Sequence, residues 1–257
     1  MARPEPLVRD VAEFLQRNVP WGGEHDVSQV MGYVQAIYLR AVGLFRAAQL
    51  LIEHDKPEEA LIIGRSLFTE SLRLERLAKA RREEGENGVA AFVLKWRLDG
   101  IQEIENLNAY AVRSGQADED DSVRERFARE RQQIERYRVR TGVGPLRPFG
   151  DEEQLARELG RADDIVPYRM AHQHAHGLGH AYVFRLSLRE DGLVQIRDSA
   201  PAEVGMGTLV AATLSRSLLL AHRAAVELFD WPEPPELDGL LRRATVSTGS
   251  SGIIERL

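Results

Sequence analysis

The chain has 257 residues, of which 43% are hydrophobic and 29% are charged, and its formal net charge is -6. This length and composition are those of a globular protein with a substantial hydrophobic core. The absence of cysteine excludes disulfides, cysteine-ligated zinc and a cysteine nucleophile, and the negative charge gives no support to a nucleic-acid binder that is basic overall.

The N-terminal segment predicts a helix over residues 4–18, with two prolines at its start and Leu7, Val11 and Phe14 on one face. The first ten residues include Glu5 and Asp10 and no apolar run, so we expect no signal peptide. No stretch of the chain approaches the roughly 20 apolar residues of a membrane span. We therefore expect a cytoplasmic protein without a membrane partner.

The strongest periodic pattern predicts a helix over residues 26–54, with Asp26 as its N-cap. Its apolar residues are spaced alternately by three and four positions, which is typical of a helix packed along another helix. They are Met31, Val34, Tyr38, Ala41, Phe45, Ala48 and Ile52. A second helix over 57–84 is expected to begin with Asp55 as its cap and Pro57 in its first turn. Because the connection is short, the two helices should be antiparallel neighbours, and the small Gly64 and Ser71 would allow a close approach.

A break at EGENG precedes a third long helix, expected over 89–113. We expect six of its side chains to face the core: Phe92, Trp96, Ile101, Ile104, Leu107 and Ala111. The next predicted helix, over 122–140, is mostly charged, and only a narrow stripe can face inwards. That stripe consists of Val123, Phe127, Ile134 and Tyr137. Residues 141–150 contain three glycines and two prolines and are read as an internal linker.

The C-terminal half begins with a short predicted helix over 151–159 and a second one from about residue 163. Residues 182–198 alternate in polarity around Asp191–Gly192, which favours a small β-hairpin; a continued helix is the alternative. A strongly apolar helix over 202–229 should be central, and a short helix and a flexible tail follow it. The sequence therefore predicts an all-α fold, an antiparallel helical bundle of long helices with a small β-hairpin inserted before the last long helix. We expect one bundle domain over 1–231 and a C-terminal tail over 232–257.

Candidate chemistry is concentrated in residues 167–180, which read PYRMAHQHAHGLGH and contain four of the seven histidines. On a helix, with about 100° per residue, Arg169, His172 and His176 share one face, and Tyr168 lies at its margin. His174 lies on another side. His180 joins the face only if the helix continues past Gly177.

A metal site is one interpretation of this stretch. The pairs His172/His176 and His176/His180 have the i, i+4 spacing of metal ligands. A metalloprotease would need a glutamate after the first histidine, where this chain has Gln173, and no Glu-x-x-His pair of a di-iron bundle is present. A metal would therefore be held by two or three histidines and a carboxylate from elsewhere, such as Glu70.

Acid–base chemistry on a phosphodiester is the second interpretation, and it requires no cofactor. It needs a histidine to move a proton and a cation to hold the phosphate, which His176 and Arg169 could provide. The arrangement resembles the prokaryotic HEPN-type helical domains, whose motif is an arginine, four to six residues and a histidine. Arg169 to His174 fits the shortest form and Arg169 to His176 the longest, and the shared helix face favours His176.

This resemblance implies a metal-independent ribonuclease with RNA as its substrate. It also implies a homodimer that brings two motifs together and a role as a toxin or in phage defence, with a cognate antitoxin or other partner protein. Arg169 and His176 would then be catalytic, with His172 and Tyr168 in support.

A broader likeness is to a bacterial family of helical domains of unknown function. The chain is similar to that family in two runs, Arg65-SLFT-Glu70 on an early long helix and Tyr168-Arg169…His176-Gly177 near a short hairpin. The likeness spans roughly residues 27–230. Glu70 would lie at the edge of the buried face, either paired with an arginine or histidine or orienting a catalytic histidine.

Two further readings stay open at this point. The histidines could be ordinary capping, paired or solvent-facing residues of a non-catalytic helical interaction or sensor module. Alternatively, the chain could be a metal-binding protein that uses His172, His176 and His180. His222, in the apolar helix over 202–229, is expected to be a core histidine with a hydrogen-bond partner.

Overall fold

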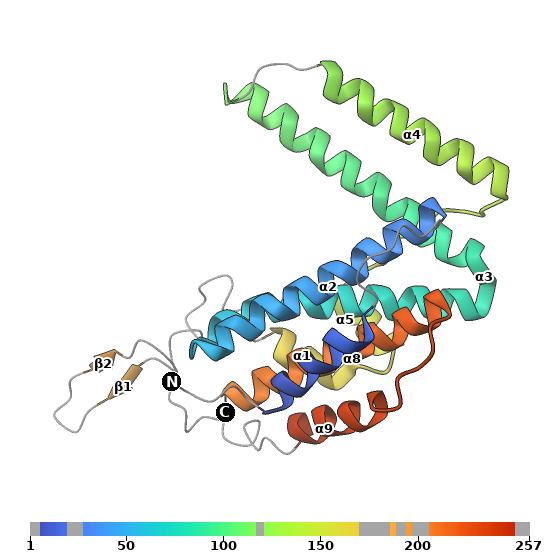
Figure 1. The fold of residues 1–257 in the computed structure, drawn as a ribbon. Coiled ribbons are helices and arrows are strands. Elements are labelled where there is room, and N and C mark those ends of the chain that lie inside the picture. The colour runs from blue at the N-terminus through green and yellow to red at the C-terminus, as the bar shows by residue number, and fades with distance from the viewer. Residues whose placement is uncertain are drawn as a thin grey trace.

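A computed structural model describes residues 6–19, 28–116, 121–169, 186–188, 194–196 and 206–249 (Figure 1). The prediction of an all-α fold is confirmed. Within these described residues, seven longer helices occur together with one short 3-10 helix and two very short strands. In chain order they are α1 (Pro6–Asn18), α2 (Gln29–Glu53), α3 (Pro57–Arg113), α4 (Asp121–Thr141), α5 (Glu152–Glu158), η1 (Ala162–Asp164), β1 (Leu186–Leu188), β2 (Val194–Ile196), α8 (Met206–Phe229) and α9 (Leu237–Gly249).

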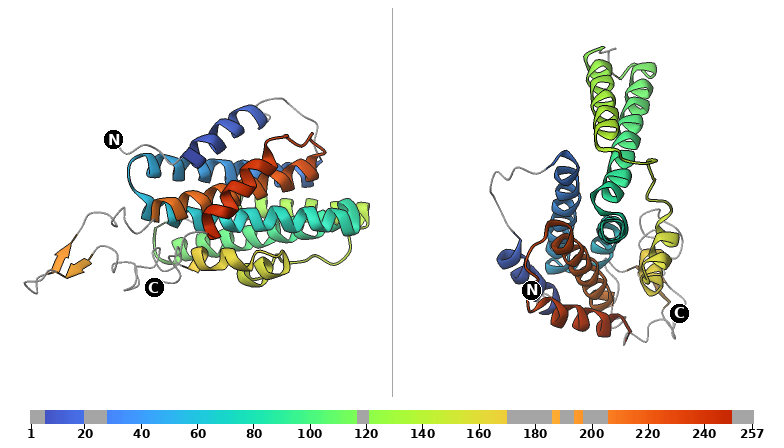
Figure 2. Two further views of the ribbon diagram at one scale, coloured as in Figure 1. Left: turned by 90° about the horizontal axis from the view of Figure 1, so that it is seen from below. Right: turned by 90° about the vertical axis from the view of Figure 1, so that its right-hand side faces the viewer.

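The bundle is organised around α8, which contacts α1, α2, α3 and α9 (Figures 1 and 2). Of the helices that the structure describes, α8 is the one with the length and apolar composition of a membrane span. However, 83% of the apolar stretch of this helix is buried inside the protein. Its composition is therefore that of a core helix. As predicted, α2 and the first half of α3 run antiparallel beside each other.

Small residues let α3 approach α8 closely; the sequence predicted a close approach at these positions but did not identify the neighbouring helix. A Cβ atom at Gly64 would lie 2.9 Å from Leu214 Cδ2 on α8. Ser71, two turns further along α3, is fully buried. A larger side chain at either position would push the two helices apart, so these small residues fix the interhelical distance.

A kink at Gly85 divides α3 into two halves. This residue has φ +68° and ψ -156°, a conformation that is almost exclusive to glycine. The break predicted at EGENG is therefore real, but only one residue leaves the helical conformation. The two helices expected over 57–84 and 89–113 consequently form one kinked element.

The second half of α3 and the antiparallel α4 form an arm that projects from the bundle (Figures 1 and 2). The predicted stripe of α4 is confirmed, because Phe127 and Ile134 are buried against α3. The inward orientation predicted for Ile104 and Leu107 is wrong, since these side chains are 43% and 63% exposed. Among the described elements, α4 is the one that packs beside this part of α3, and it leaves these two side chains uncovered.

The predicted caps need correction. The N-cap of α2 is Ser28, whose Oγ accepts a hydrogen bond of 3.3 Å from the backbone N–H of Met31; Asp26 lies outside the described residues. Asp55 does not cap α3, because it adopts a left-handed turn with φ +58°. Lys56 occupies the N-cap position without a side-chain hydrogen bond, and Pro57 is the first residue of the helix, as expected.

The predicted β-hairpin over 182–198 is also corrected. Among the described residues, strand conformation is limited to the two three-residue stretches β1 and β2, which pair antiparallel with Leu186 opposite Ile196. A ladder of this length adds no β-layer to the protein. Among the described residues, the fold is therefore a helical bundle in which β structure is limited to this one short pairing.

The C-terminal helix is longer than the sequence predicted. The segment TVSTG, expected to be flexible, forms the last turns of α9. Leu237, Leu240, Leu241 and Ala244 on this helix join the same core as α1 and α8.

Candidate functional site

The described part of the predicted site is the segment 161–169, which leads into the histidine stretch. Residues 162–164 form η1, and residues 165–169 continue as a helix. Ile165 is buried and Tyr168 half-buried against a small apolar cluster with Phe68 and Leu72 of α3. The rings of Tyr168 and Phe68 lie 5.3 Å apart. This apolar contact holds the segment against the first half of α3.

Arg169 lies at the surface, with 61% of its side chain exposed. Its Nε and Nη2 groups donate to the two carboxylate oxygens of Glu153 on α5, at 2.8 and 2.7 Å. The hydrogen bond from Arg169 lowers the pKa of the Glu153 carboxyl, and Glu153 in turn raises the pKa of Arg169. Exposed ion pairs contribute little to stability, so a phosphate can compete with Glu153 for this guanidinium.

Arg65 lies beside Tyr168. Its guanidinium carbon is 5.7 Å from the centre of the Tyr168 ring, a distance typical of a cation–π contact. Within the part of the chain that the structure describes, no carboxylate forms an ion pair with Arg65. The two runs that the sequence singled out therefore meet in space, and they place an arginine without an acidic partner next to Tyr168.

Glu70 is more deeply buried than the sequence predicted, with 3% exposure. It forms an ion pair with Arg40 Nε of α2 at 3.1 Å and accepts two hydrogen bonds of 3.2 Å from Arg73 Nη1. The predicted arginine pairing of Glu70 is thus confirmed. Both carboxylate oxygens are engaged, which argues against Glu70 as a metal ligand. Among the residues with described positions, no group of three metal-ligating side chains occurs.

A surface pocket of about 370 Å³ lies over this ion pair, between α2 and α3. Its lining contains three cations, one carboxylate and two hydroxyl groups. The residues are Arg40, Ile62, Arg65, Ser66, Thr69, Glu70 and Arg73. Because Glu70 neutralises only one of the three guanidinium groups, the pocket has a formal charge of about +2 at neutral pH.

A family model of a family of unknown function, DUF5677, matches residues 31–193. The chain belongs to the DUF5677 family. The match includes both the Arg65–Glu70 run and the Tyr168–Gly177 run, and it ends before α8 begins. No curated protein and no solved structure matches the chain. Membership of the DUF5677 family agrees with the predicted likeness to helical domains of unknown function and assigns no activity.

Four of the predicted site residues of this DUF5677 member lie outside the described residues. They are His172, His174, His176 and His180. Their predicted faces, their suitability as metal ligands and their distance from Arg169 therefore remain predictions.

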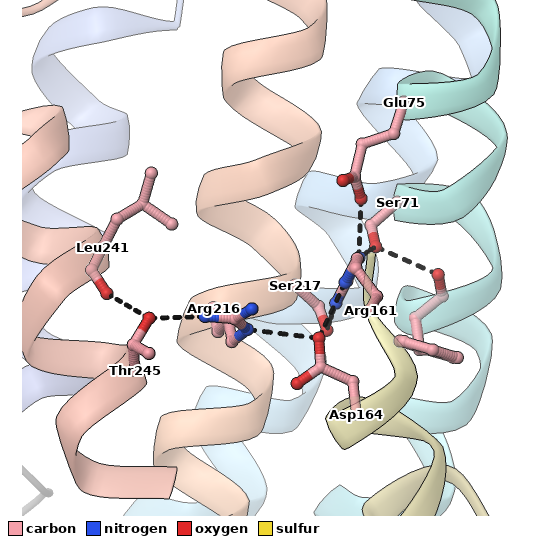
Figure 3. A network of polar contacts seen from close by, with 9 residues as sticks. Ser71, Glu75, Arg161, Asp164, Arg216, Ser217, Leu241 and Thr245 are labelled. Atoms are coloured by element: carbon pink, nitrogen blue, oxygen red, sulfur yellow. Dashed lines mark hydrogen bonds and ion pairs between the residues drawn. The ribbon is translucent and has the colours of Figure 1, made fainter. Parts of the chain in front are cut away.

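Sequence reasoning missed a buried polar network centred on Arg161 (Figure 3). The Arg161 side chain is 3% exposed. It donates to Glu75 of α3 at 2.6 Å and to Asp164 of η1 at 2.7 Å. It also donates to Ser71 of α3 and, at 3.3 Å, to Ser217 of α8.

The network continues from Asp164 through Arg216 to Thr245, and so joins η1, α8 and α9 (Figure 3). Burial raises the pKa of Glu75, and the nearby Arg161 opposes that change. The charges of the two arginines and the two carboxylates balance, so we interpret the network as structural. It ties the segment that carries Tyr168 and Arg169 to the core helices. The sequence signals for it are the Arg161-x-x-Asp164 spacing and two serines on otherwise apolar helix faces.

His222 is the core histidine that the sequence predicted, with no exposed surface. Its Nδ1 lies 2.7 Å from the Tyr38 hydroxyl, and its ring packs edge-on against Phe14 at 4.9 Å. No described protein group hydrogen-bonds to its Nε2. Burial lowers the pKa of His222 to about 4 and raises that of Tyr38, so both are neutral at pH 7.

Proposed function

We propose that this protein cleaves RNA without a metal ion, with Arg169 binding the scissile phosphate and His176 transferring the proton. His172 and Tyr168 would support these two residues. The observation that carries the proposal is the position of Arg169. It is an exposed guanidinium on an anchored helix, directly before the histidine stretch, and its one described partner is the surface carboxylate of Glu153.

The chemistry needs only groups of these types. A histidine removes the proton of a ribose 2′-hydroxyl, whose oxygen forms a bond to phosphorus while the bond to the 5′-oxygen breaks. The departing oxygen takes up a proton from an acid. A guanidinium stabilises the negative charge that develops on the non-bridging oxygens, through paired N–H donors. An unperturbed histidine, with a pKa of about 6.5, is suited to both proton transfers.

The resemblance to HEPN-type domains extends this proposal. It implies a homodimer in which two motifs face each other, and a role as a toxin or in phage defence with a partner protein that restrains the activity. Membership of the DUF5677 family is compatible with this extension and does not specify it.

The test is an RNA-cleavage assay with the purified full chain, single-stranded RNA and an excess of chelator. Arg169→Ala and His176→Ala should each reduce the cleavage rate by at least about 100-fold. Arg157→Ala is the matched control, because Arg157 is also exposed and also pairs with Glu153, at 3.3 Å. This variant should cleave like the wild type. Intact RNA with wild-type protein, or cleavage that survives both Arg169→Ala and His176→Ala, would refute the proposal.

A non-catalytic interaction module is the second candidate, and the arm favours it. The second half of α3 exposes Ile104, Leu107 and Tyr110 to solvent at 43, 63 and 62%. These residues lie three positions apart and so form an apolar strip along the helix. The RNA assay separates the two candidates, because an interaction module leaves RNA intact whatever stands at positions 169 and 176.

A further inference from the structure

The pocket between α2 and α3 combines features that a phosphate group requires. It presents three guanidinium groups, and one of them, Arg65, has no ion-pair partner among the described residues. Ser66 adds a hydroxyl that makes no hydrogen bond with any residue the structure describes. Thr69 contributes less, because its hydroxyl donates to the Arg65 carbonyl at 3.2 Å. The free donors are therefore those of Arg65, Ser66 and the remaining N–H groups of Arg40 and Arg73.

The buried Glu70 keeps two of these arginines in place. Arg40 contacts Glu70 through Nε and Arg73 through Nη1. Because a guanidinium carries five N–H donors in a rigid plane, each arginine retains unused donors after binding Glu70. Arg73 also stacks over Phe149, 5.8 Å from the ring centre. The side chains of Arg40 and Arg73 are therefore held in place before any anion arrives, which lowers the entropy cost of binding.

Position links this pocket to the proposed cleavage site. Arg65 lines the pocket and also stacks on Tyr168, the residue before Arg169. Arg169 does not line the pocket, but it follows Tyr168 directly in the chain, so the two cationic groups are separate and lie on either side of one residue. A polymer with regularly spaced phosphates could occupy both at once.

We infer that this pocket is a second phosphate-binding site, which holds a backbone phosphate of RNA next to the one bound by Arg169. The identity of RNA as the source of that phosphate rests on the proposed function, whereas the affinity of the pocket for phosphate does not. Arg65 is the principal phosphate ligand, Arg40 and Arg73 flank it, and Glu70 is a positioning residue.

The test measures binding rather than cleavage. The probes are inorganic phosphate and a single-stranded oligonucleotide whose 2′-hydroxyls are all methylated, so that the 2′-oxygen cannot attack. Arg65→Ala should weaken binding of both probes by about tenfold, the loss expected for hydrogen bonds to a charged group. It should also reduce the slope of log affinity against log salt for the oligonucleotide by about 0.7, the value for one phosphate contact on a single strand. Arg65→Lys should recover part of the affinity, because it restores the charge without the planar donors.

Arg129→Ala is the matched control, since Arg129 is exposed on α4 and lies outside the pocket. It removes the same charge and should leave both affinities and the salt slope unchanged. Circular dichroism and thermal unfolding of each variant verify that the fold persists.

The outcomes separate the pocket from the cleavage proposal. If Arg65→Ala and Arg40→Ala bind the oligonucleotide as tightly as the wild type does, the pocket assignment is overturned, even when RNA is cleaved. If the oligonucleotide binds through Arg65 but unmodified RNA stays intact, the pocket stands and the cleavage proposal falls. If inorganic phosphate binds and the oligonucleotide does not, the assignment to RNA is overturned in favour of a small phosphate ligand.

Discussion

Arg161 fixes the position of the segment that carries Tyr168 and Arg169. Its guanidinium is nearly fully buried and contacts groups from η1, α3 and α8. A buried guanidinium is costly to desolvate, and here two carboxylates and two hydroxyls compensate for that cost. The contribution of this residue is therefore the location of the candidate site more than net stability.

Arg161→Ala should lower the free energy of unfolding by about 3–5 kcal/mol, because it leaves Glu75 buried without its ion-pair partner and removes one of the two arginines that pair with Asp164. Urea denaturation monitored by circular dichroism measures the effect. Arg157→Ala, four residues earlier and exposed in a surface ion pair, should cost less than about 1 kcal/mol. Equal losses in the two variants would show that the network does not stabilise the fold.

Because His222 is buried, we expect the free energy of unfolding to decrease at acid pH. Its pKa in the folded protein, about 4, lies below the value of 6.5 for an unperturbed histidine. The unfolded chain therefore binds this proton first as the pH falls, so the contribution of His222 is complete above about pH 6.5 and is lost progressively towards pH 4. At about 1.4 kcal/mol for each pKa unit, the loss is about 3 kcal/mol.

Denaturation between pH 4 and pH 7 tests this expectation. His222→Gln should remove about 3 kcal/mol of the pH dependence. His54→Gln is the control and should leave the contribution of His222 in place, because His54 is exposed at the end of α2. A wild-type profile that is flat over this range, or one that His222→Gln leaves unaltered, would contradict the assignment.

At the scale of the element, α3 supplies most of the residues that line the proposed phosphate-binding pocket. Its first half packs against α2 and α8 and supplies Arg65, Glu70 and Arg73, whereas its second half forms the arm with α4. Gly85 supplies the conformation of the kink. Gly88 leaves room for the Ala80 carbonyl oxygen, which would lie only 2.7 Å from a Cβ atom at position 88.

Gly88→Ala should therefore destabilise the protein by about 1–3 kcal/mol, since the obstructing atom belongs to the backbone and cannot rotate away. Gly100→Ala, on the same helix with nothing within 4 Å of the added methyl group, should stabilise it by about 0.4–1 kcal/mol. Thermal unfolding of both variants measures the difference. A stabilising Gly88→Ala would mean that the kink relaxes at no cost.

At the scale of the whole molecule, the bundle and the arm present two surfaces of different chemical character. The face over the first half of α3 presents arginines around a buried glutamate, and the arm presents an apolar strip. The arm is held by charged pairs such as Arg97 Nη2 to Glu130 Oε2 at 2.9 Å, while its apolar residues at 104, 107 and 110 face solvent. The proposed chemistry thus belongs to the bundle, and an association surface would belong to the arm.

The sequence by itself determined the helical character of the protein and most helix positions, because the periodic apolar faces of α2, α4 and α8 are continuous and local. It also identified Arg65, Glu70, Tyr168 and Arg169. It placed Ile104 and Leu107 wrongly, because periodicity gives the apolar face of a helix but not whether another element covers it. A short alternating segment likewise predicted a hairpin over 182–198, whereas β1 and β2 pair over only three residues each.

Only the tertiary structure decided which of these residues meet. The contact of Arg65 with Tyr168 joins positions more than one hundred residues apart, and the Arg161 network joins three helices and η1. Such contacts depend on how the helices pack, and a local pattern does not encode the packing. For this reason the sequence identified the candidate residues, while the fold brought three arginines together around Glu70 and placed their pocket beside Tyr168.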